Sequence, residues 1–168
     1  MRSRSAALGT EALRSGPGEG EHVWFAGALV TIKVPGEAVA GRCTMVEFLL
    51  ARHTSPPRHH HPHDETFTLI DGNLTFVSGE DRFECEAGAS WVVPAGVEHT
   101  FRVESETARL VAVFAPAGME RCFREGGVPA DTPTLPPADA PTRPFDEIEQ
   151  AMRAHGHNNV GPPLGPDD

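Results

Sequence analysis

Histidine is concentrated in one short part of the sequence. Five of the nine histidines lie between positions 53 and 63, and residues 56–65 read PPRHHHPHDE. Successive side chains of an extended strand point to opposite faces, so His59, His61 and Glu65 share one face if this segment is extended. Two imidazoles in alternate positions of a strand, with a carboxylate nearby, can chelate one divalent ion. The spacing therefore predicts metal chemistry at the start of a strand.

A second segment with the same potential lies downstream, where residues 88–99 read GASWVVPAGVEH. Pro94 predicts the end of a strand, because proline has no N–H for a sheet ladder, and Gly96 predicts a turn. His99 begins the next strand and has the parity of Phe101, so its imidazole can also point inward. His99 is therefore a further candidate for the same inner face.

The two segments together resemble the two sequence motifs of the cupin superfamily. The first motif, His-x-His, three residues, Glu, six residues, Gly, is matched by His59, His61, Glu65 and Gly72. The second, Gly, five residues, Pro-x-Gly, two residues, His, is matched by Gly88, Pro94, Gly96 and His99. The sequence departs from the pattern at His53 and Val103, where glycine and asparagine are expected. Over residues 22–116 it is similar to small bacterial single-domain cupins of the quercetin 2,3-dioxygenase-like group.

This resemblance implies a metal centre with one divalent ion per chain, held by His59, His61, Glu65 and His99. Iron, manganese, nickel, cobalt and zinc all suit such ligands, and the order of affinities does not choose among them. Three histidines and one glutamate leave coordination positions open, which is typical of a catalytic rather than a structural site. The residues indicate no other cofactor.

Short apolar runs separated by turn residues fill the middle of the chain. Asp71-Gly72 between two such runs predicts a β-hairpin. Strands at this spacing, without long helices between them, favour an all-β antiparallel architecture, and the resemblance specifies a jelly-roll (cupin) barrel. The expected organisation is a flexible N-terminal arm over residues 1–21, the barrel over 22–116, and a C-terminal part over 117–168.

The C-terminal part is expected to contain two short helices around a proline-rich strap. Met119, Cys122 and Phe123 share a face within 117–127, and Gly126 offers a stop. Phe145, Ile148 and Met152 repeat at helical spacing within 144–156, after a proline and with acidic residues in the first turn. Both apolar faces are expected to cover the barrel or a partner subunit.

The charge balance limits the classes of partner. With 14 Lys and Arg against 24 Asp and Glu, the formal net charge is −10, which argues against nucleic acid or an anionic membrane. No apolar run reaches the roughly 18 residues of a membrane span, and the first residues lack the apolar core of a secretory signal. Cys43, Cys85 and Cys122 are odd in number and widely spaced, which favours a reducing cytoplasm. A small-molecule substrate and a homodimer are the expected partners.

The expected function is that of a metal-dependent dioxygenase acting on a small enol or phenol of flavonol-like or polyketide-like character. Glu65 would act as the catalytic general base that accepts the substrate's proton, after which dioxygen reacts with the deprotonated substrate. A non-redox cyclase or isomerase, with zinc or nickel as Lewis acid, is an alternative. A non-catalytic barrel that binds a small molecule is another.

Several nearby residues are weaker candidates. His63 is a possible substrate-side or alternative ligand, and Glu47 a possible partner of a ligand histidine, whereas His60 and Asp64 have the opposite parity and are expected to face solvent. Aromatic residues of the strands are expected mostly in the core, with a pocket for an aromatic or apolar ligand as the alternative. These are Trp24, Phe67, Phe76, Trp91, Phe101 and Phe114.

Overall fold

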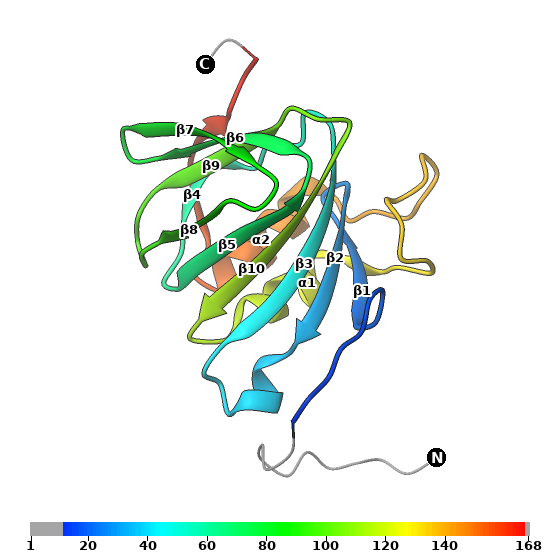
Figure 1. Ribbon diagram of the computed structural model, residues 1–168. Helices are drawn as coiled ribbons and strands as arrows, with labels where there is room; N and C mark the ends of the chain where they lie inside the picture. Colours follow the sequence, from blue (N-terminus) through cyan, green and yellow to red (C-terminus); the bar gives the residue numbers. More distant parts are fainter. Residues whose placement is uncertain (1–11, 167–168) are drawn as a thin grey trace, which may run out of the picture.

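Two antiparallel β-sheets form the central part of the fold (Figure 1). The computed structural model describes residues 12–166, so residues 1–11 of the expected N-terminal arm and the last two residues lie outside it. The larger sheet has the order β11-β1-β2-β3-β10-β5-β8. Its strands are β1 (Glu21–Phe25), β2 (Ala28–Val34), β3 (Thr44–Ala51), β5 (Asp64–Asp71), β8 (Ser90–Val93), β10 (Thr107–Ala115) and β11 (Val128–Pro129).

The smaller sheet has the order β12-β4-β9-β6-β7. Its strands are β4 (Pro57–His60), β6 (Asn73–Ser78), β7 (Asp81–Glu86), β9 (His99–Val103) and β12 (Asn158–Pro163). A short 3-10 helix, η1 (Gly36–Val39), and two α-helices complete the described part of the chain, α1 (Met119–Gly126) and α2 (Phe145–Ala154). The expected all-β class with short C-terminal helices is therefore confirmed. Within residues 12–166 the strands pair as two separate sheets rather than as one continuous closed barrel.

The core lies between the two sheets because the central strands alternate in side-chain character. In β5 the buried side chains are those of Glu65, Phe67 and Leu69, with more exposed residues between them. β10 buries every second residue in the same way. The facing sheet contributes Leu74 and Phe76 of β6, which are almost fully buried. Alternate side chains of a strand point to one face, so this pattern gives each sheet an apolar inner surface.

The prediction of a β-hairpin at Asp71-Gly72 is wrong. β5 pairs with β10 and β8, whereas β6 pairs with β7 and β9, so the dipeptide carries the chain from one sheet to the other. Gly72 has a φ of +86°, and a Cβ on it would lie only 2.4 Å from the carbonyl oxygen of Thr107. Glycine is required at this crossing because of both its backbone conformation and the close approach of β10.

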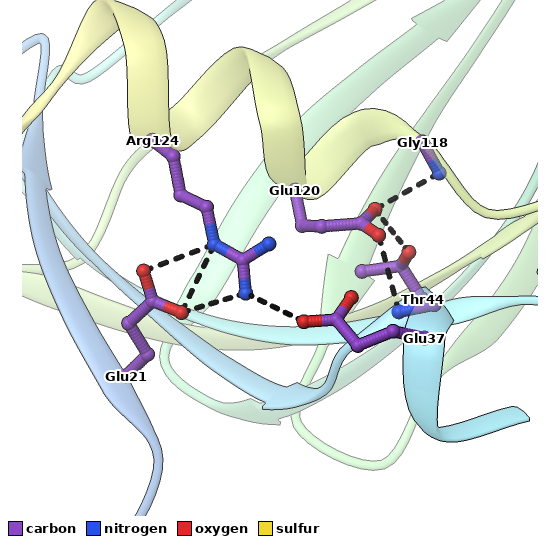
Figure 2. Close-up of polar contacts among 7 residues, drawn as sticks. Glu21, Glu37, Thr44, Gly118, Glu120 and Arg124 are labelled. Atoms are coloured by element: carbon purple, nitrogen blue, oxygen red, sulfur yellow. Dashed lines mark hydrogen bonds and ion pairs between the residues drawn. The ribbon is translucent and has the colours of Figure 1, made fainter. Parts of the chain in front are cut away.

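Two polar networks hold α1 against the rest of the protein (Figure 2). Glu120, which is 2% exposed, accepts hydrogen bonds from the Gly36 N–H (3.1 Å), the Gly118 N–H (2.9 Å) and the Thr44 hydroxyl. Arg124, one turn further along α1, donates to both carboxylate oxygens of Glu21 in β1 at 2.7–3.0 Å. α1 is therefore fixed at its first turn by a buried carboxylate and at its last turn by an exposed ion pair.

The C-terminal part folds back over the sheets of its own chain. The indole N–H of Trp24 donates to the carbonyl oxygen of Thr134 in the proline-rich strap at 2.9 Å. α2 packs on α1, where a Cβ on Gly126 would lie 3.4 Å from Cβ of Ala151. β12, drawn in red in Figure 1, then runs antiparallel beside β4. These contacts fix both helices against the rest of the chain and place β12 at the edge of the smaller sheet.

The three cysteines are free thiols, and Cys85 and Cys122 are buried in the core. Burial raises the pKa of Cys85 to about 11 and, with the nearby Glu125 carboxylate, that of Cys122 to about 12. Both thiols therefore stay protonated and pack as small apolar side chains. No helix within residues 12–166 is long and apolar enough to cross a membrane.

Candidate metal centre

Three histidines meet between the sheets, one from each of the neighbouring strands β4 and β9 and one from the bend after β4. His59 in β4 lies directly opposite His99 in β9, in the only register pair assigned to these two strands. His61 follows β4 in the bend that leads to β5. Each of the three is at least 94% buried, and one ligand nitrogen of each lies within 4.8 Å of the others. The two segments singled out in the sequence are thus brought together in space.

Glu65 reaches this cluster from the opposite sheet. It lies at the start of β5, paired with Val93 of β8 and Phe114 of β10, and its side chain is buried. Its Oε2 lies 2.9 Å from Nε2 of His61 and 3.2 Å from Nε2 of His99. The chain bends at His61–His63 and changes sheet between His59 and Glu65. The shared inner face nevertheless persists across the bend, because all odd-numbered residues from 59 to 69 are buried.

Backbone hydrogen bonds join the two segments beside the cluster. Pro94, Ala95 and Gly96 form a turn. The Gly96 N–H donates a hydrogen bond to the carbonyl oxygen of His61 at 2.9 Å. The Ala95 N–H donates to Oδ1 of the exposed Asp64 at the same distance. The Pro-x-Gly turn is therefore a clamp that fixes the bend of the histidine segment.

Backbone carbonyls also orient two of the imidazoles. Nδ1 of His59 lies 2.7 Å from the carbonyl oxygen of Pro57, and Nδ1 of His99 lies 2.9 Å from that of Val97. A carbonyl only accepts hydrogen bonds, so each Nδ1 carries the proton and each Nε2 keeps a free lone pair. This arrangement is typical of metal-binding histidines, whose second nitrogen is held by a backbone or carboxylate oxygen.

Burial and the neighbouring groups shift the pKa values of His59 and Glu65. Desolvation, with the neighbouring His99, lowers the pKa of His59 to about 3. Burial alone would raise the pKa of Glu65, but the neighbouring imidazoles of His61 and His99 outweigh this effect and lower it. A neutral imidazole and an ionised carboxylate are the forms that bind metals. Three nitrogen donors and one oxygen donor therefore fit a divalent transition metal, whose ligands would be His59, His61, His99 and Glu65.

A cavity of about 520 Å³ opens onto the histidine cluster. This volume lies within the range of small-molecule sites, about 300–1,000 Å³. Most of its wall is apolar, and three of the aromatic residues singled out in the sequence, Phe67, Phe101 and Phe114, belong to it. α1 and α2 supply a further part of the wall, including Phe123 and Ile148. Trp24, Phe76 and Trp91 pack instead outside the cavity lining.

The weaker candidates fall outside the cluster of three histidines. His63 is buried with its ring 5.5 Å from that of His61 and 6.2 Å from that of Phe114. Desolvation and the nearby His61 lower its pKa. Glu47 forms a partly exposed ion pair with Arg109 at 3.0 Å, so its carboxylate is engaged by an arginine rather than by a ligand histidine. His60 lies on the other face of β4 and is partly exposed.

Sequence reasoning missed two residues beside the cluster, His157 and Asn159. Both line the cavity. The His157 ring stacks on that of His59, with centroids 4.1 Å apart and planes at 21°. Desolvation and the surrounding histidines lower the pKa of His157 to about 2. The only signal in the sequence was the isolated His-Asn-Asn after the second helix, and no local pattern connects it to a segment about a hundred residues earlier.

The comparisons with known proteins agree with the fold and the motifs. The family model described as the cupin domain matches residues 46–114, from β3 to β10. Quercetin 2,3-dioxygenase of Bacillus subtilis is 30% identical over 96 residues, which cover 57% of this chain and 28% of that protein. The chain thus spans under a third of the length of this curated relative.

Solved structures are similar in fold at low sequence identity. An RmlC-like cupin from Shewanella frigidimarina superposes with a TM-score of 0.55 at 16% identity, covering 68% of this chain and 98% of that one. Oxalate decarboxylase of Bacillus subtilis gives a TM-score of 0.53 at 18% identity, covering 58% of this chain and 27% of that one. The two motifs, the match to the cupin domain over residues 46–114 and the two-sheet architecture coincide, and the chain has a cupin fold.

Proposed function

We propose that this cupin is a metal-dependent dioxygenase of a small enol or phenol, such as a flavonol. The observation that carries the proposal is the position of the histidine cluster and Glu65 in the wall of a largely apolar cavity of small-molecule size. The similarity to a quercetin 2,3-dioxygenase supports a flavonol as the first substrate to test.

His59, His61, His99 and Glu65 would hold one divalent ion. Such an ion supplies a Lewis acid for the substrate's oxygen and, where it is redox-active, an electron path between substrate and dioxygen. The backbone partners of His59 and His99 keep both imidazoles oriented before any substrate enters. This preorganisation reduces the reorganisation needed when the substrate binds.

Glu65 is the residue that would move the proton. Its carboxylate is ionised, buried and in the cavity wall, so Oε2 can accept the proton of an enol or phenol that enters. For a flavonol, both atoms of dioxygen enter the ring-opened product, the two ring bonds to the carbon that bears the enol oxygen break, and this carbon leaves with its oxygen as carbon monoxide. The proton held on Glu65 returns to the product. Phe67, Phe101 and Phe114 would surround the substrate's rings and exclude water from the reacting atoms.

The test combines metal analysis with oxygen consumption. Protein purified without a histidine tag or added metal is measured by mass spectrometry for bound metal, and then assayed with quercetin in an oxygen electrode. Near-stoichiometric iron, manganese, cobalt or nickel, with quercetin-dependent oxygen uptake, would support the proposal. Turnover without oxygen uptake would support a non-redox cyclase or isomerase instead, and binding without any turnover would support a binding protein.

A pair of carboxylate variants tests the role of Glu65. The Gln of Glu65→Gln keeps an oxygen ligand but cannot accept a proton, so we expect metal to remain bound while turnover falls at least about a hundredfold. Asp64→Asn is the matched control, because Asp64 is exposed and the asparagine side chain still has an oxygen that can accept from the Ala95 N–H. Unchanged turnover in Glu65→Gln would rule out Glu65 as the base.

A cytoplasmic location and a homodimer stay predictions for this protein.

A further inference from the structure

His157 is a buried histidine that neither cupin motif contains. Its side chain is more than nine-tenths buried, and its Nε2 has no hydrogen-bond partner among residues 12–166. Leaving a buried polar atom unpaired is unfavourable, and native proteins rarely do so without a reason. Because this nitrogen belongs to a residue of the cavity wall, the structure indicates a ligand contact.

The pairing of β12 with β4 explains why His157 faces the cavity. Asn159 lies opposite His59 in this antiparallel pair, and Asn158 lies opposite His60. Continuing the register by one residue puts His157 opposite His61. Residues directly opposite each other in a sheet share a face, so His157 and Asn159 lie on the same side as the metal-binding histidines.

The turn before His157 is tightly packed, which fixes the position of the imidazole. Gly156 has a φ of +81°, and a Cβ on it would lie 2.9 Å from Cδ of Pro62 in the bend between β4 and β5. The His157 ring itself stacks on the His59 ring. The close approach of the turn to Pro62 and the stacked His59 ring thus fix the position of the imidazole.

Asn159 supplies a second polar atom of defined character. Its amide nitrogen lies 3.5 Å from Oε1 of Glu149 in α2. A carboxylate can only accept, so the amide N–H₂ faces Glu149 and the oxygen Oδ1 is directed elsewhere. That oxygen is buried and has no hydrogen-bond partner among the described residues. Asn159 therefore presents an acceptor that requires a donor from a ligand.

We propose that His157 and Asn159 bind a hydroxyl group of an aromatic ligand and so determine which substrates the cavity accepts. The inference rests on the proposed function, because the ligand's other polar end is the enol or phenol held at the metal. A hydroxyl can donate to Oδ1 of Asn159 and also form a hydrogen bond with Nε2 of His157. A carboxylate has no proton for Oδ1 and would lie close to Glu149, so the pair selects hydroxylated aromatic compounds over aromatic acids.

The test uses two probes that differ in their hydroxyl groups. Quercetin and unsubstituted flavonol share the same chelating enol and ketone, but only quercetin carries further hydroxyls on its rings. Dissociation constants are measured anaerobically on metal-loaded protein by fluorescence titration, so that no turnover is needed. For the wild type we expect quercetin to bind more tightly than unsubstituted flavonol.

Three variants test which residues make quercetin bind more tightly than unsubstituted flavonol. His157→Phe keeps a flat ring against His59 without nitrogen atoms, and Asn159→Leu keeps the side-chain volume without polar atoms. Each is expected to weaken quercetin binding about tenfold and leave the affinity for unsubstituted flavonol unchanged. Asn158→Leu, the same change on the opposite face of β12, is the control and is expected to preserve the discrimination. Asn159→Leu alone decides the matter if His157→Phe fails to fold.

Metal content and circular dichroism are measured on every variant. A loss of metal in His157→Phe would overturn the proposal and make His157 a metal ligand. Equal weakening of both probes would also overturn it and assign the residues a structural role, as would a wild type that binds neither probe. Selective quercetin binding without oxygen uptake would refute the dioxygenase and leave this inference standing.

Discussion

Replacing Glu120 is expected to loosen the first turn of α1. The carboxylate accepts through Oε1 from the Gly36 N–H and through Oε2 from the Gly118 N–H and the Thr44 hydroxyl (Figure 2). In Glu120→Gln one oxygen becomes an NH₂ group, which cannot accept. In the better orientation this group faces Gly36, so the variant loses that hydrogen bond and keeps the two at Oε2 as neutral ones.

The expected magnitude follows from these three hydrogen bonds. Hydrogen bonds to a charged group contribute about 1.5–3 kcal/mol each and neutral ones about 1 kcal/mol. One lost and two weakened bonds reduce the free energy of unfolding by about 3 kcal/mol. Urea unfolding at pH 7 measures this as a fall in the midpoint of about 1–2 M. Thr44→Val, which removes one donor and keeps the carboxylate, is expected to cost less than Glu120→Gln.

Acid titration provides a second readout of the same contacts. Burial alone would raise the pKa of Glu120, but the hydrogen bonds from Thr44, Gly118 and Gly36 outweigh it, so the folded pKa is lowered from its ordinary 4.5. The stabilisation from the ionised carboxylate is complete above about pH 4.5 and is lost as the pH falls through the lowered folded value. The difference in the free energy of unfolding between the wild type and Glu120→Gln should therefore become smaller as the pH is lowered. Equal stability at pH 7 with parallel acid profiles would refute this reasoning.

Two further changes probe the metal centre and the crossing between the sheets. His99→Ala removes one of the three clustered nitrogens, so we expect tight metal binding to be lost while circular dichroism shows a folded protein; unchanged metal content would exclude His99 as a ligand. Gly72→Ala should destabilise more than Gly79→Ala in urea unfolding, by about 1–3 kcal/mol, because both glycines have positive φ but only a Cβ on Gly72 would meet the backbone of β10. Equal losses would show that the neighbouring backbone gives way at no cost.

The inner face of the candidate metal centre could be predicted from the sequence because it depends on local alternation. His59, His61 and Glu65 keep one parity, and all three are buried as that parity requires. The bend at Pro62 does not disturb the pattern, since the Gly96 clamp holds the chain where β4 gives way to β5. Strand alternation and motif spacing thus predicted the shared buried face correctly, although the sequence did not reveal that the chain changes sheet between His59 and Glu65.

The features that depend on distant pairing could not be predicted. Asp71-Gly72 marks a turn, but a turn dipeptide does not say whether the flanking strands pair with each other. β12 follows a proline-rich strap and ends in Gly161-Pro162-Pro163, which reads as loop. Only the register of β12 with β4 shows that this segment is a strand and that His157 lies beside the histidine cluster. Long-range pairing is fixed by the packing of the whole sandwich and has no local sequence signal.

The pairing of β12 with β4 also has a consequence for aggregation. Without β12, β4 would be the edge of the smaller sheet, and its unpaired backbone groups would be open to strands of other molecules. β12 covers this edge and becomes the new one, where Pro162 and Pro163 have no N–H to offer an incoming strand. The strand that follows His157 and contains Asn159 therefore also ends the sheet in a form that resists further strand addition, so protection of this edge and the proposed ligand contacts depend on one short segment, residues 157–163.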